Sequence, residues 1–289
     1  MNNAAPTPGD YSLGISIVCY KSDPVLLART LASLQAAVAT ARSELSLQVA
    51  LTLIDNGDEG SHLQALLQQS ELRSCSQLIS NAHNTGFAAA NNQAINNAVS
   101  SFHLVLNPDV ELDSAALLNG LIYLLQHERV VAVSPACING DGVAEHLCKR
   151  YPSVFDLLLR GFAPVVLRRL FDSRLARYEY RELAQQQVAT AVELISGCFM
   201  LCRTAALQQV GGFDERYFLY FEDFVLSLAL GRIGELHHVP QCRITHHGGG
   251  AAQRALPAGS HPDGRRHPCS RRGQRTGGEG RHPVPGGVS

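Results

Sequence analysis

Two short acidic sequences hold the side chains best suited to chemistry. Asp109 ends the tripeptide Asn107-Pro108-Asp109 directly after an apolar run. A carboxylate there is a hard oxygen ligand for Mg²⁺ or Mn²⁺ bridging two phosphates. Glu222 and Asp223 follow a run of Tyr and Phe, where partial loss of water raises the pKa of a carboxylate and suits it to act as a general base. Taken singly, a turn and an acidic helix start also explain these sequences.

A further acid follows another apolar run. Asp55 and Asn56 come at the end of the run VALTLID, and a carboxylate at the carboxyl end of a strand can accept hydrogen bonds from a nucleobase N–H or a ribose hydroxyl. The sequence Asp-Asn-Gly is also a favourable turn, so this pair alone leaves both explanations open.

The sequence NTGFAAANN, residues 84–92, is rich in side-chain amides. Asn84 is placed to cap a helix, and Gly86 permits a close approach of the backbone. Capping does not explain Asn91 and Asn92 one helical turn later. Part of this cluster therefore requires another function.

These polar clusters lie in an alternation of strand-like and helix-like sequences. The strand-like runs are 14–20, 49–55, 76–80, 102–107 and 130–136, and helix-like sequences separate the first four and the last two. This alternation is typical of βαβ units, and apolar runs of this kind indicate buried parallel strands. We predict a doubly wound α/β fold with a mostly parallel sheet. Ligands of such sheets bind beyond the carboxyl ends of the strands, where the polar clusters fall.

The second half of the chain is less regular. Residues 153–170 are apolar, are interrupted by Pro164 and contain Arg160, Arg168 and Arg169. We favour two short helices packed on the domain, and the alternative is a segment that touches an anionic membrane through its arginines. Further along, we predict a strand over 192–203, a short helix, a turn at 211–218, a helix from about Glu222 to Gly231, and a strand over 236–242.

Charge and composition exclude some classes of function. Residues 248–289 hold seven Arg and two acids, whereas the rest of the chain holds 17 basic and 23 acidic residues. The body is acidic, so we expect no nucleic-acid partner. No stretch approaches the roughly 18 uninterrupted apolar residues of a membrane span. The eight cysteines are scattered, and we interpret them as reduced core residues.

The two ends of the chain differ in composition from the body. Residues 1–12 show no basic segment followed by an apolar run, so we expect a flexible lead-in, no secretory signal and a cytoplasmic protein. The last 42 residues contain eleven Gly and five Pro, which favours disorder. We therefore predict that residues 251–289 form a disordered tail, and its bias resembles a coding sequence translated in a shifted frame.

Together the clusters resemble the family 2 glycosyltransferases, especially bacterial rhamnosyltransferase-like members. The matching sequences are SIVCYKSD, LIDNG, NTGFAAANNQAI, LNPDV, the long stretch from ISGCFMLCR to FLYFED, and His246, which together span about residues 13 to 250. Six motifs in this order are a strong signal. The resemblance implies a GT-A domain over 13–250, with helices on both faces of the sheet.

The resemblance also implies roles for the matching residues. Asp223, with Glu222, would be the catalytic base, and Asp109 with His246 would bind Mg²⁺ or Mn²⁺, with His247 as the alternative ligand. The residues implied to bind the donor are Asp55, Asn56, Asn84, Gly86, Phe87, Asn91, Asn107 and Asp109. The implied reaction is an inverting transfer of a sugar, such as rhamnose, from a nucleotide-sugar donor to a glycan or lipid-linked acceptor.

The implied setting is the synthesis of O-antigen or another cell-surface polysaccharide, with peripheral contact at the inner face of the cytoplasmic membrane. The chain departs from the family pattern E-D-x-D-L-x-L-R, because Val225 and Ala229 replace its second acid and its arginine. A catalytically impaired sugar-nucleotide-binding homologue is therefore the alternative.

Overall fold

The computed structural model describes residues 11–218 and 220–248. The expected tail at 251–289 and the first ten residues of the expected lead-in lie outside this part. Tyr11 and Ser12 already belong to the first strand, so the ordered domain begins two residues earlier than the sequence predicts.

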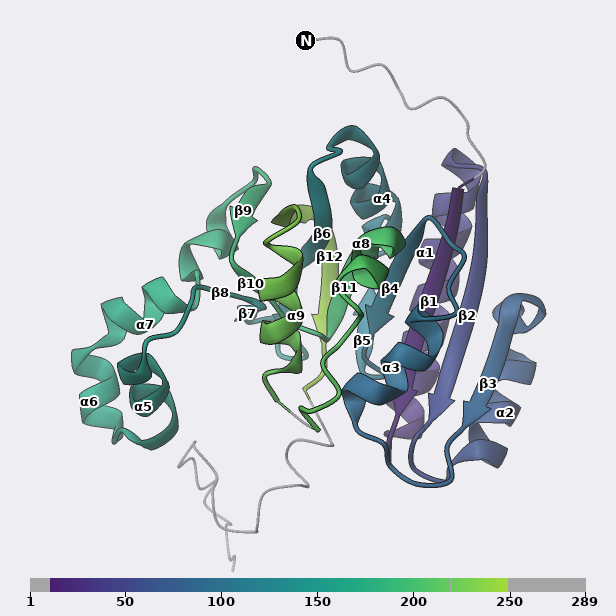
Figure 1. The fold of residues 1–289 in the computed structure, drawn as a ribbon, viewed down its shortest axis with the longest axis horizontal. Coiled ribbons are helices and arrows are strands. Elements are labelled where there is room, and N and C mark those ends of the chain that lie inside the picture. The colour runs from purple at the N-terminus through teal and green to yellow at the C-terminus, as the bar shows by residue number, and fades with distance from the viewer. Residues whose placement is uncertain (1–10, 219, 249–289) are drawn as a thin grey trace, which may run out of the picture. The chain divides into compact units, whose positions relative to one another are not determined.

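The described chain is built around one large twisted sheet (Figure 1). Its strands are β1 (Tyr11–Cys19), β2 (Leu47–Asp55), β3 (Ser76–Ser80), β4 (Phe102–Leu106), β5 (Val110–Leu112), β6 (Val130–Asn139), β7 (Ala144–Glu145), β9 (Thr190–Val192), β11 (Phe199–Arg203) and β12 (Glu235–His246). The main path runs β3-β2-β1-β4-β11-β6-β12-β5. A separate pair joins β8 (Cys148–Lys149) to β10 (Leu194–Ile195).

Helices cover both faces of this sheet, as the family resemblance implies, and three further helices, within residues 154–178, stand out to one side of it. The helices are α1 (Pro24–Glu44), α2 (Gly60–Gln69), α3 (Phe87–Ile95), α4 (Ala116–Gln126), α5 (Val154–Phe162), α6 (Val165–Leu170), α7 (Asp172–Tyr178), α8 (Thr204–Gln209) and α9 (Glu222–Leu230), with 3₁₀ turns η1 (Glu71–Cys75) and η2 (Arg181–Gln185). The break at Pro164 separates α5 from α6, which confirms the two short helices, but they pack mainly on each other and on α7 and not on the domain as predicted.

The two faces carry separate apolar clusters. On one face, leucines of α1, α2 and α4 pack against β1, β2 and β4. On the other, α3, α8 and α9 pack against alternate residues of β4 and β11, such as Val105 and Met200. Strand side chains alternate between faces, so the continuous apolar runs in the sequence correspond to strands buried on both sides.

Helix α1 is placed by its capping sequence and its apolar stripe. The Asp23 carboxylate accepts hydrogen bonds from the N–H groups of Val25 and Leu26, and Pro24 suits the first helical position. Among the described residues, α1 is long and apolar enough to cross a membrane by length and composition. Its buried residues, which include Leu27 and Leu34, are part of the domain core.

The sheet differs from the sequence prediction in strand direction, in strand burial and at 192–203, where one predicted strand is divided among β9, β10 and β11. The five predicted strands do share one direction, but antiparallel β11 lies between β4 and β6. In addition, β3 is an edge strand and is only partly buried. A run of apolar residues carries no information on strand direction, which explains the first difference. All seven described cysteines are free, and six of them are buried.

Asn92 joins α3 to the segment that precedes α9. Its buried side chain donates a hydrogen bond to the carbonyl of Phe213 (2.9 Å) and accepts one from the N–H of the same residue (2.9 Å). Replacement by Ala leaves two buried backbone groups unpaired, at about 1–3 kcal/mol each. We expect Asn92→Ala to lower the free energy of unfolding by about 2–4 kcal/mol in urea denaturation. Asn97→Ala, on the exposed continuation of α3, should change it by less than about 0.5 kcal/mol.

Candidate active site

The predicted site residues gather at one edge of the sheet. Asp55 ends β2, Asn84 follows β3, and Asn107 follows β4, all at the carboxyl ends of parallel strands. Strand β12 is parallel to β6, so its last residue, His246, reaches the same edge. Gly197, which contacts Asp223, precedes the antiparallel strand β11 and thus lies there too. The topology confirms that the polar clusters meet where a doubly wound sheet binds ligands.

Asp109 and His246 lie side by side at this edge. Val110, next to Asp109, is the pairing partner of His246 across β5 and β12. The Asp109 Oδ1 and His246 Nε2 atoms are 3.5 Å apart. On its other side, His246 Nδ1 makes a 2.9 Å contact with Glu145 of β7. Burial lowers the pKa of His246, but the two carboxylates outweigh this effect and raise it to about 10.

This pair fits a divalent cation. The facing atoms, Asp109 Oδ1 and His246 Nε2, are both buried and have no hydrogen-bond partner. Glu145 holds the opposite ring nitrogen, as carboxylates commonly do for metal-binding histidines. In the described residues no group of three His, Cys, Asp or Glu side chains could hold a metal. Two protein ligands are sufficient where a diphosphate supplies further oxygens, which is the usual arrangement for Mg²⁺.

His247 faces a different carboxylate. Its Nε2 atom lies 2.6 Å from Glu111, which also makes a 2.6 Å ion pair with Arg29 of α1. The backbone N–H of His247 donates to the carbonyl of Asp109. Of the two adjacent histidines, His246 is therefore the one whose side chain faces Asp109.

Asp223 lies at the start of α9 and is held by backbone groups. Its Oδ2 atom accepts a hydrogen bond from the N–H of Gly197 (3.2 Å), and Oδ1 accepts one from Phe224 (2.9 Å). Burial raises the pKa of Asp223 above its ordinary value, while these hydrogen bonds and the charge of Lys149 lower it in part. Burial also raises the pKa of the neighbouring Glu222. A raised pKa is suited to a general base.

A short segment links the two acidic sites. Gly197 donates to Asp223, and the carbonyl of the next residue, Cys198, accepts from the N–H of Asn107 (2.9 Å). Asn107 is two residues from Asp109. The dipeptide just before β11 thus bonds both to the Asp223 carboxylate and to the backbone two residues before Asp109. The Phe87 ring packs against Gly197, so closely that a Cβ added to Gly197 would lie 3.2 Å from the ring.

Asp55 and Asn56 organise the loops around them. The Asp55 carboxylate accepts hydrogen bonds from the N–H groups of Gly57 and Glu59, each at 3.0 Å. The Asn56 amide donates to Asn84 (2.8 Å) and accepts from Thr85 (3.0 Å). Both side chains are buried and engaged within the chain. Asp55, Asn56 and Gly57 therefore form a turn, as one of the two explanations requires. The side chain of Asn56 also holds the loop after β3 in place.

The predicted cap of α3 is wrong in detail. Gly86 is the N-cap, with a φ of +84°, and it provides no side-chain cap. Asn84 instead accepts a hydrogen bond from the N–H of Gly86 (2.9 Å). Asn91 is fully buried and accepts from Ser16 of β1 (2.8 Å). Its amide therefore positions α3 on the sheet, and Phe87 makes an edge-to-face contact with Phe213.

Gly86 confirms the predicted close backbone approach. A Cβ at this position would lie 2.9 Å from the carbonyl oxygen of Phe218, and the φ of +84° disfavours any other residue. We expect Gly86→Ala to reduce donor affinity at least tenfold, because the loop after β3 and the segment before α9 must separate. Isothermal titration with nucleotide should measure this loss, and Gly142→Ala is the control, since it has a similar φ and open space.

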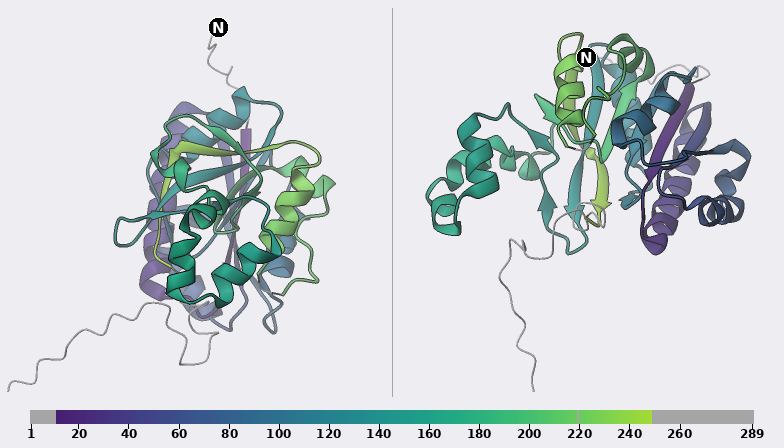
Figure 2. Two further views of the ribbon diagram at one scale, coloured as in Figure 1. Left: turned by 90° about the vertical axis from the view of Figure 1, so that its left-hand side faces the viewer. Right: turned by 60° about the horizontal axis from the view of Figure 1, so that its bottom comes forward.

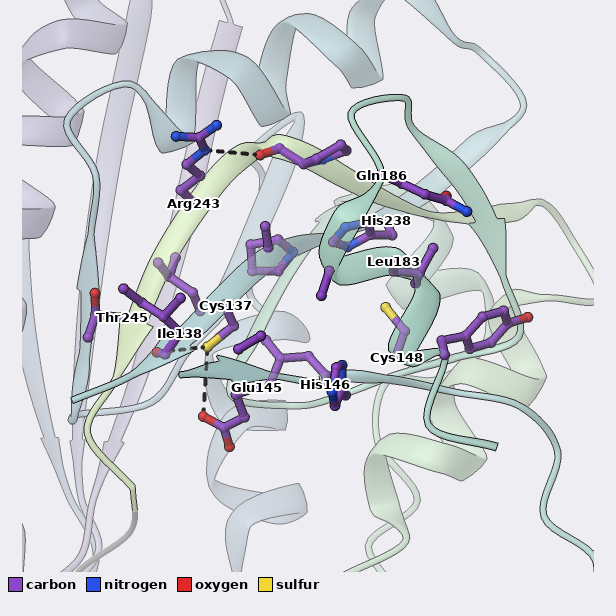
Figure 3. A pocket seen from close by; sticks show the side chains of 18 of the residues that line it. Cys137, Ile138, Glu145, His146, Cys148, Leu183, Gln186, His238, Arg243 and Thr245 are labelled. Atoms are coloured by element: carbon purple, nitrogen blue, oxygen red, sulfur yellow. Dashed lines mark hydrogen bonds between the residues drawn. The ribbon is translucent and has the colours of Figure 1, made fainter. Parts of the chain in front are cut away.

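Two charged residues near the site could not be identified as site residues from the sequence. Glu145 comes from the β6–β7 hairpin and also borders a cavity of about 370 Å³, where its carboxylate accepts a weak hydrogen bond from Cys137 (3.8 Å; Figure 3). Lys149 is buried in β8, and its charge lowers the pKa of Asp223. Burial in turn lowers the pKa of Lys149 to about 8. Neither residue lies in a motif with recognisable spacing.

Comparison with curated proteins gives relatives of one kind. The chain is 31% identical over 248 residues to an N-acetylglucosaminyl-diphospho-decaprenol L-rhamnosyltransferase of Mycobacterium tuberculosis, covering 81% of this chain and 76% of that protein. It is 29% identical over 169 residues to the rhamnosyltransferase WbbL of Escherichia coli, covering 57% of this chain and 60% of that protein.

Solved structures share the fold at low sequence identity. GalNAc-T7 with UDP, GalNAc and Mn²⁺ matches with a TM-score of 0.59 and 16% identity, over 82% of this chain and 44% of that chain. A mannosyltransferase from Pyrobaculum calidifontis with GDP-Man and Mn²⁺ matches with a TM-score of 0.57 and 14% identity, over 84% and 59%. These likenesses confirm the GT-A-like α/β fold.

A protein-family comparison covers most of the domain. The model for glycosyl transferase family 2 matches residues 15–211, which include the strand ends that carry Asp55, Asn84 and Asp109. With the rhamnosyltransferase relatives and the shared fold, this match shows that the chain is a glycosyltransferase and belongs to glycosyl transferase family 2.

Proposed function

We propose that this glycosyltransferase moves a deoxyhexose such as rhamnose from a nucleoside-diphosphate donor to a lipid-linked glycan acceptor, with inversion at the anomeric carbon. The observation that carries the proposal is that Asp223 and the backbone of Asn107 bond to the consecutive residues Gly197 and Cys198, which supports a base near the proposed metal ligands. The two rhamnosyltransferase relatives support the choice of sugar.

Asp109 and His246 would hold Mg²⁺ or Mn²⁺, which when bound neutralises charge on the departing diphosphate. Glu145 would fix the His246 ring so that Nε2 is turned towards the donor. Asp55, Asn56 and Asn84 would shape the nucleotide pocket through the loop after β3. Asn107 and Phe87 would border the sugar, between the strand edge and α3.

Asp223 would accept the proton of the acceptor hydroxyl. As the O–H bond breaks, the acceptor oxygen forms a bond to the anomeric carbon, and the bond from that carbon to the donor phosphate breaks, so that the nucleoside diphosphate leaves with the bonding electrons. The reaction needs one displacement and no covalent enzyme intermediate. Burial of Asp223 and Glu222 favours this role, because a carboxylate with a raised pKa is a stronger base.

The test is acceptor-dependent release of nucleoside diphosphate from a panel of dTDP-, UDP- and GDP-sugars. Release should need Mg²⁺ or Mn²⁺ and stop with EDTA, and proton NMR of the product should show the inverted anomer. Release that persists without any divalent cation, or a retained anomer, would contradict the proposal.

A catalytically impaired binder is the second candidate, and one observation favours it. Val225 and Ala229 of α9 stand where the family pattern has an acid and an arginine, so α9 lacks that ion pair. Calorimetry that shows metal-dependent nucleotide binding with no transfer to any acceptor would select this candidate.

We place the reaction at the cytoplasmic side of the membrane, in the synthesis of O-antigen or another cell-surface polysaccharide. The support is the named acceptor of the M. tuberculosis relative, a diphospho-decaprenol lipid. Fractionation of cells that express the tagged chain would test this placement, and recovery outside the cytoplasmic membrane barrier would contradict it.

A further inference from the structure

The helices between β8 and η2 expose a large apolar surface. We call residues 154–178 the α5–α7 unit, and Figures 1 and 2 show it standing out to one side of the main sheet. Phe162 is 84% exposed, Val166 79% and Leu170 74%. The other exposed apolar side chains of the unit are Val154, Phe155, Leu157, Leu158, Val165 and Leu167. Exposed apolar side chains are concentrated on this one small unit, and larger exposed apolar patches mark interaction sites.

This exposure is not caused by a loose segment. Ser153 and Asp156 form a reciprocal capping box at the start of α5. The buried Asp156 carboxylate also makes a 2.6 Å ion pair with Arg174 of α7. Phe155 and Phe171 meet edge to face with ring centroids 5.2 Å apart. The α5–α7 unit is therefore braced from within, and its outer side chains are presented on a defined surface.

The same unit is positively charged. It contains five arginines and two acids, and both acids are already paired, Asp156 with Arg174 and Asp172 with Arg181. Arg160, Arg168, Arg169 and Arg181 border a cavity of about 290 Å³ together with Asp172 and Glu179. Guanidinium groups suit phosphate, because their planar fork donates two parallel hydrogen bonds.

We propose that the α5–α7 unit docks the enzyme on an anionic phospholipid bilayer. Its apolar side chains would enter the boundary between headgroups and acyl chains, and its arginines would contact lipid phosphates, as in other interfacial amphipathic helices. Charge complementarity favours this occupant over a second copy of the chain, because two positively charged faces would repel each other.

Docking gives the proposed reaction a location. A lipid-linked acceptor is confined to the bilayer surface, so an enzyme held there meets it at a higher effective concentration. The inference rests on the proposed function for this purpose, but the binding surface itself is tested without any sugar transfer.

The experiment is co-sedimentation of the full chain with sucrose-loaded vesicles. Binding is expected to vesicles of phosphatidylcholine with 30% phosphatidylglycerol, and to fall at least tenfold on pure phosphatidylcholine. Phe162→Ser/Leu170→Ser should lower the partition coefficient at least thirtyfold, since both aromatic and aliphatic area would be lost from the bilayer. Arg168→Gln/Arg169→Gln should lower it about thirtyfold, the effect of two basic residues near an anionic surface.

Two control variants carry the same kinds of substitution outside the α5–α7 unit. Val99→Ser/Ile233→Ser removes exposed apolar side chains outside the unit, and Arg42→Gln/Arg73→Gln removes two exposed charges. Both should bind within threefold of the parent chain. Thermal unfolding should confirm that all four variants remain folded.

Three results would overturn the proposal. The first is absence of binding to phosphatidylglycerol vesicles, and the second is equal binding by Phe162→Ser/Leu170→Ser and the parent chain. The third is a dimer of the parent chain in ultracentrifugation that is monomeric in this variant, which would show that a second copy covers the surface. Donor-dependent nucleotide release, measured without vesicles, should be unchanged in Phe162→Ser/Leu170→Ser. Loss of vesicle binding with intact catalysis therefore separates this inference from the proposed reaction.

Discussion

Asp223→Asn is expected to lower kcat by about 10²–10⁴-fold, the range that a general base contributes. The amide cannot take the acceptor proton, yet it can still accept the hydrogen bond that Gly197 donates to residue 223. Donor affinity should therefore stay within about threefold of the parent chain. Steady-state release of nucleoside diphosphate gives kcat, and isothermal titration gives the donor affinity.

The control is Asp141→Asn, an exposed acid in the β6–β7 turn, which should retain full turnover. Glu222→Gln separates the two neighbouring acids, and it should reduce turnover less than Asp223→Asn. Full turnover in Asp223→Asn would show that Asp223 is not the base, and it would not affect the proposed metal site.

The pH profile gives the same assignment an independent test. Burial raises the pKa of Asp223, and only the ionised carboxylate can accept a proton. The value of kcat/KM should therefore decrease as the pH falls through a pKa above that of an ordinary aspartate. This acidic limb should be absent from the residual activity of Asp223→Asn. An identical limb in the variant would assign it to another group.

Asp109→Asn should reduce turnover by about 10³-fold, since a metal that neutralises the leaving group contributes several kcal/mol. The loss should be larger at limiting Mn²⁺ and should be partly relieved when Mn²⁺ is raised. His246→Asn should behave similarly because both residues face the same position. Glu145→Gln, which changes a hydrogen-bonding partner of His246 and leaves both proposed ligands in place, should weaken metal affinity about 10–100-fold.

The adjacent histidines supply the matched control. His247 contacts Glu111 and not Asp109 through its side chain, so His247→Asn should change the Mn²⁺ dependence by less than threefold. Titration of Mn²⁺ in the release assay measures both variants. A larger effect at His247 than at His246 would reverse the assignment of the ligand.

The sequence was sufficient for the fold class and for the edge of the sheet where the polar clusters lie. Asp55, Asn84 and Asn107 could be placed together because each follows an apolar run, and parallel strands end at one edge. Strand order could not be predicted in full. The antiparallel position of β11 depends on pairing between residues about a hundred apart, such as Phe199 with Leu106, and apolar periodicity does not encode it.

The amide-rich motif shows a different limit. Asn56 and Asn91 are the residue types that bind sugars and nucleotides, yet their amides bond to Asn84 and Ser16 within the chain. The residue type states what a side chain can donate or accept, and only the packing decides which partner it meets. Glu145 was missed for the converse reason, because a lone acid in a short hairpin resembles ordinary surface polarity until His246 is seen beside it.

The most direct test is a crystal structure of the enzyme with Mn²⁺ and an intact or non-hydrolysable nucleotide-sugar donor. Anomalous scattering should place the cation on Asp109 and His246, with the diphosphate completing its coordination. The Asp223 carboxylate should then face the anomeric carbon from the side opposite the diphosphate. A cation bound elsewhere, or an anomeric carbon out of reach of Asp223, would contradict the shared reaction centre.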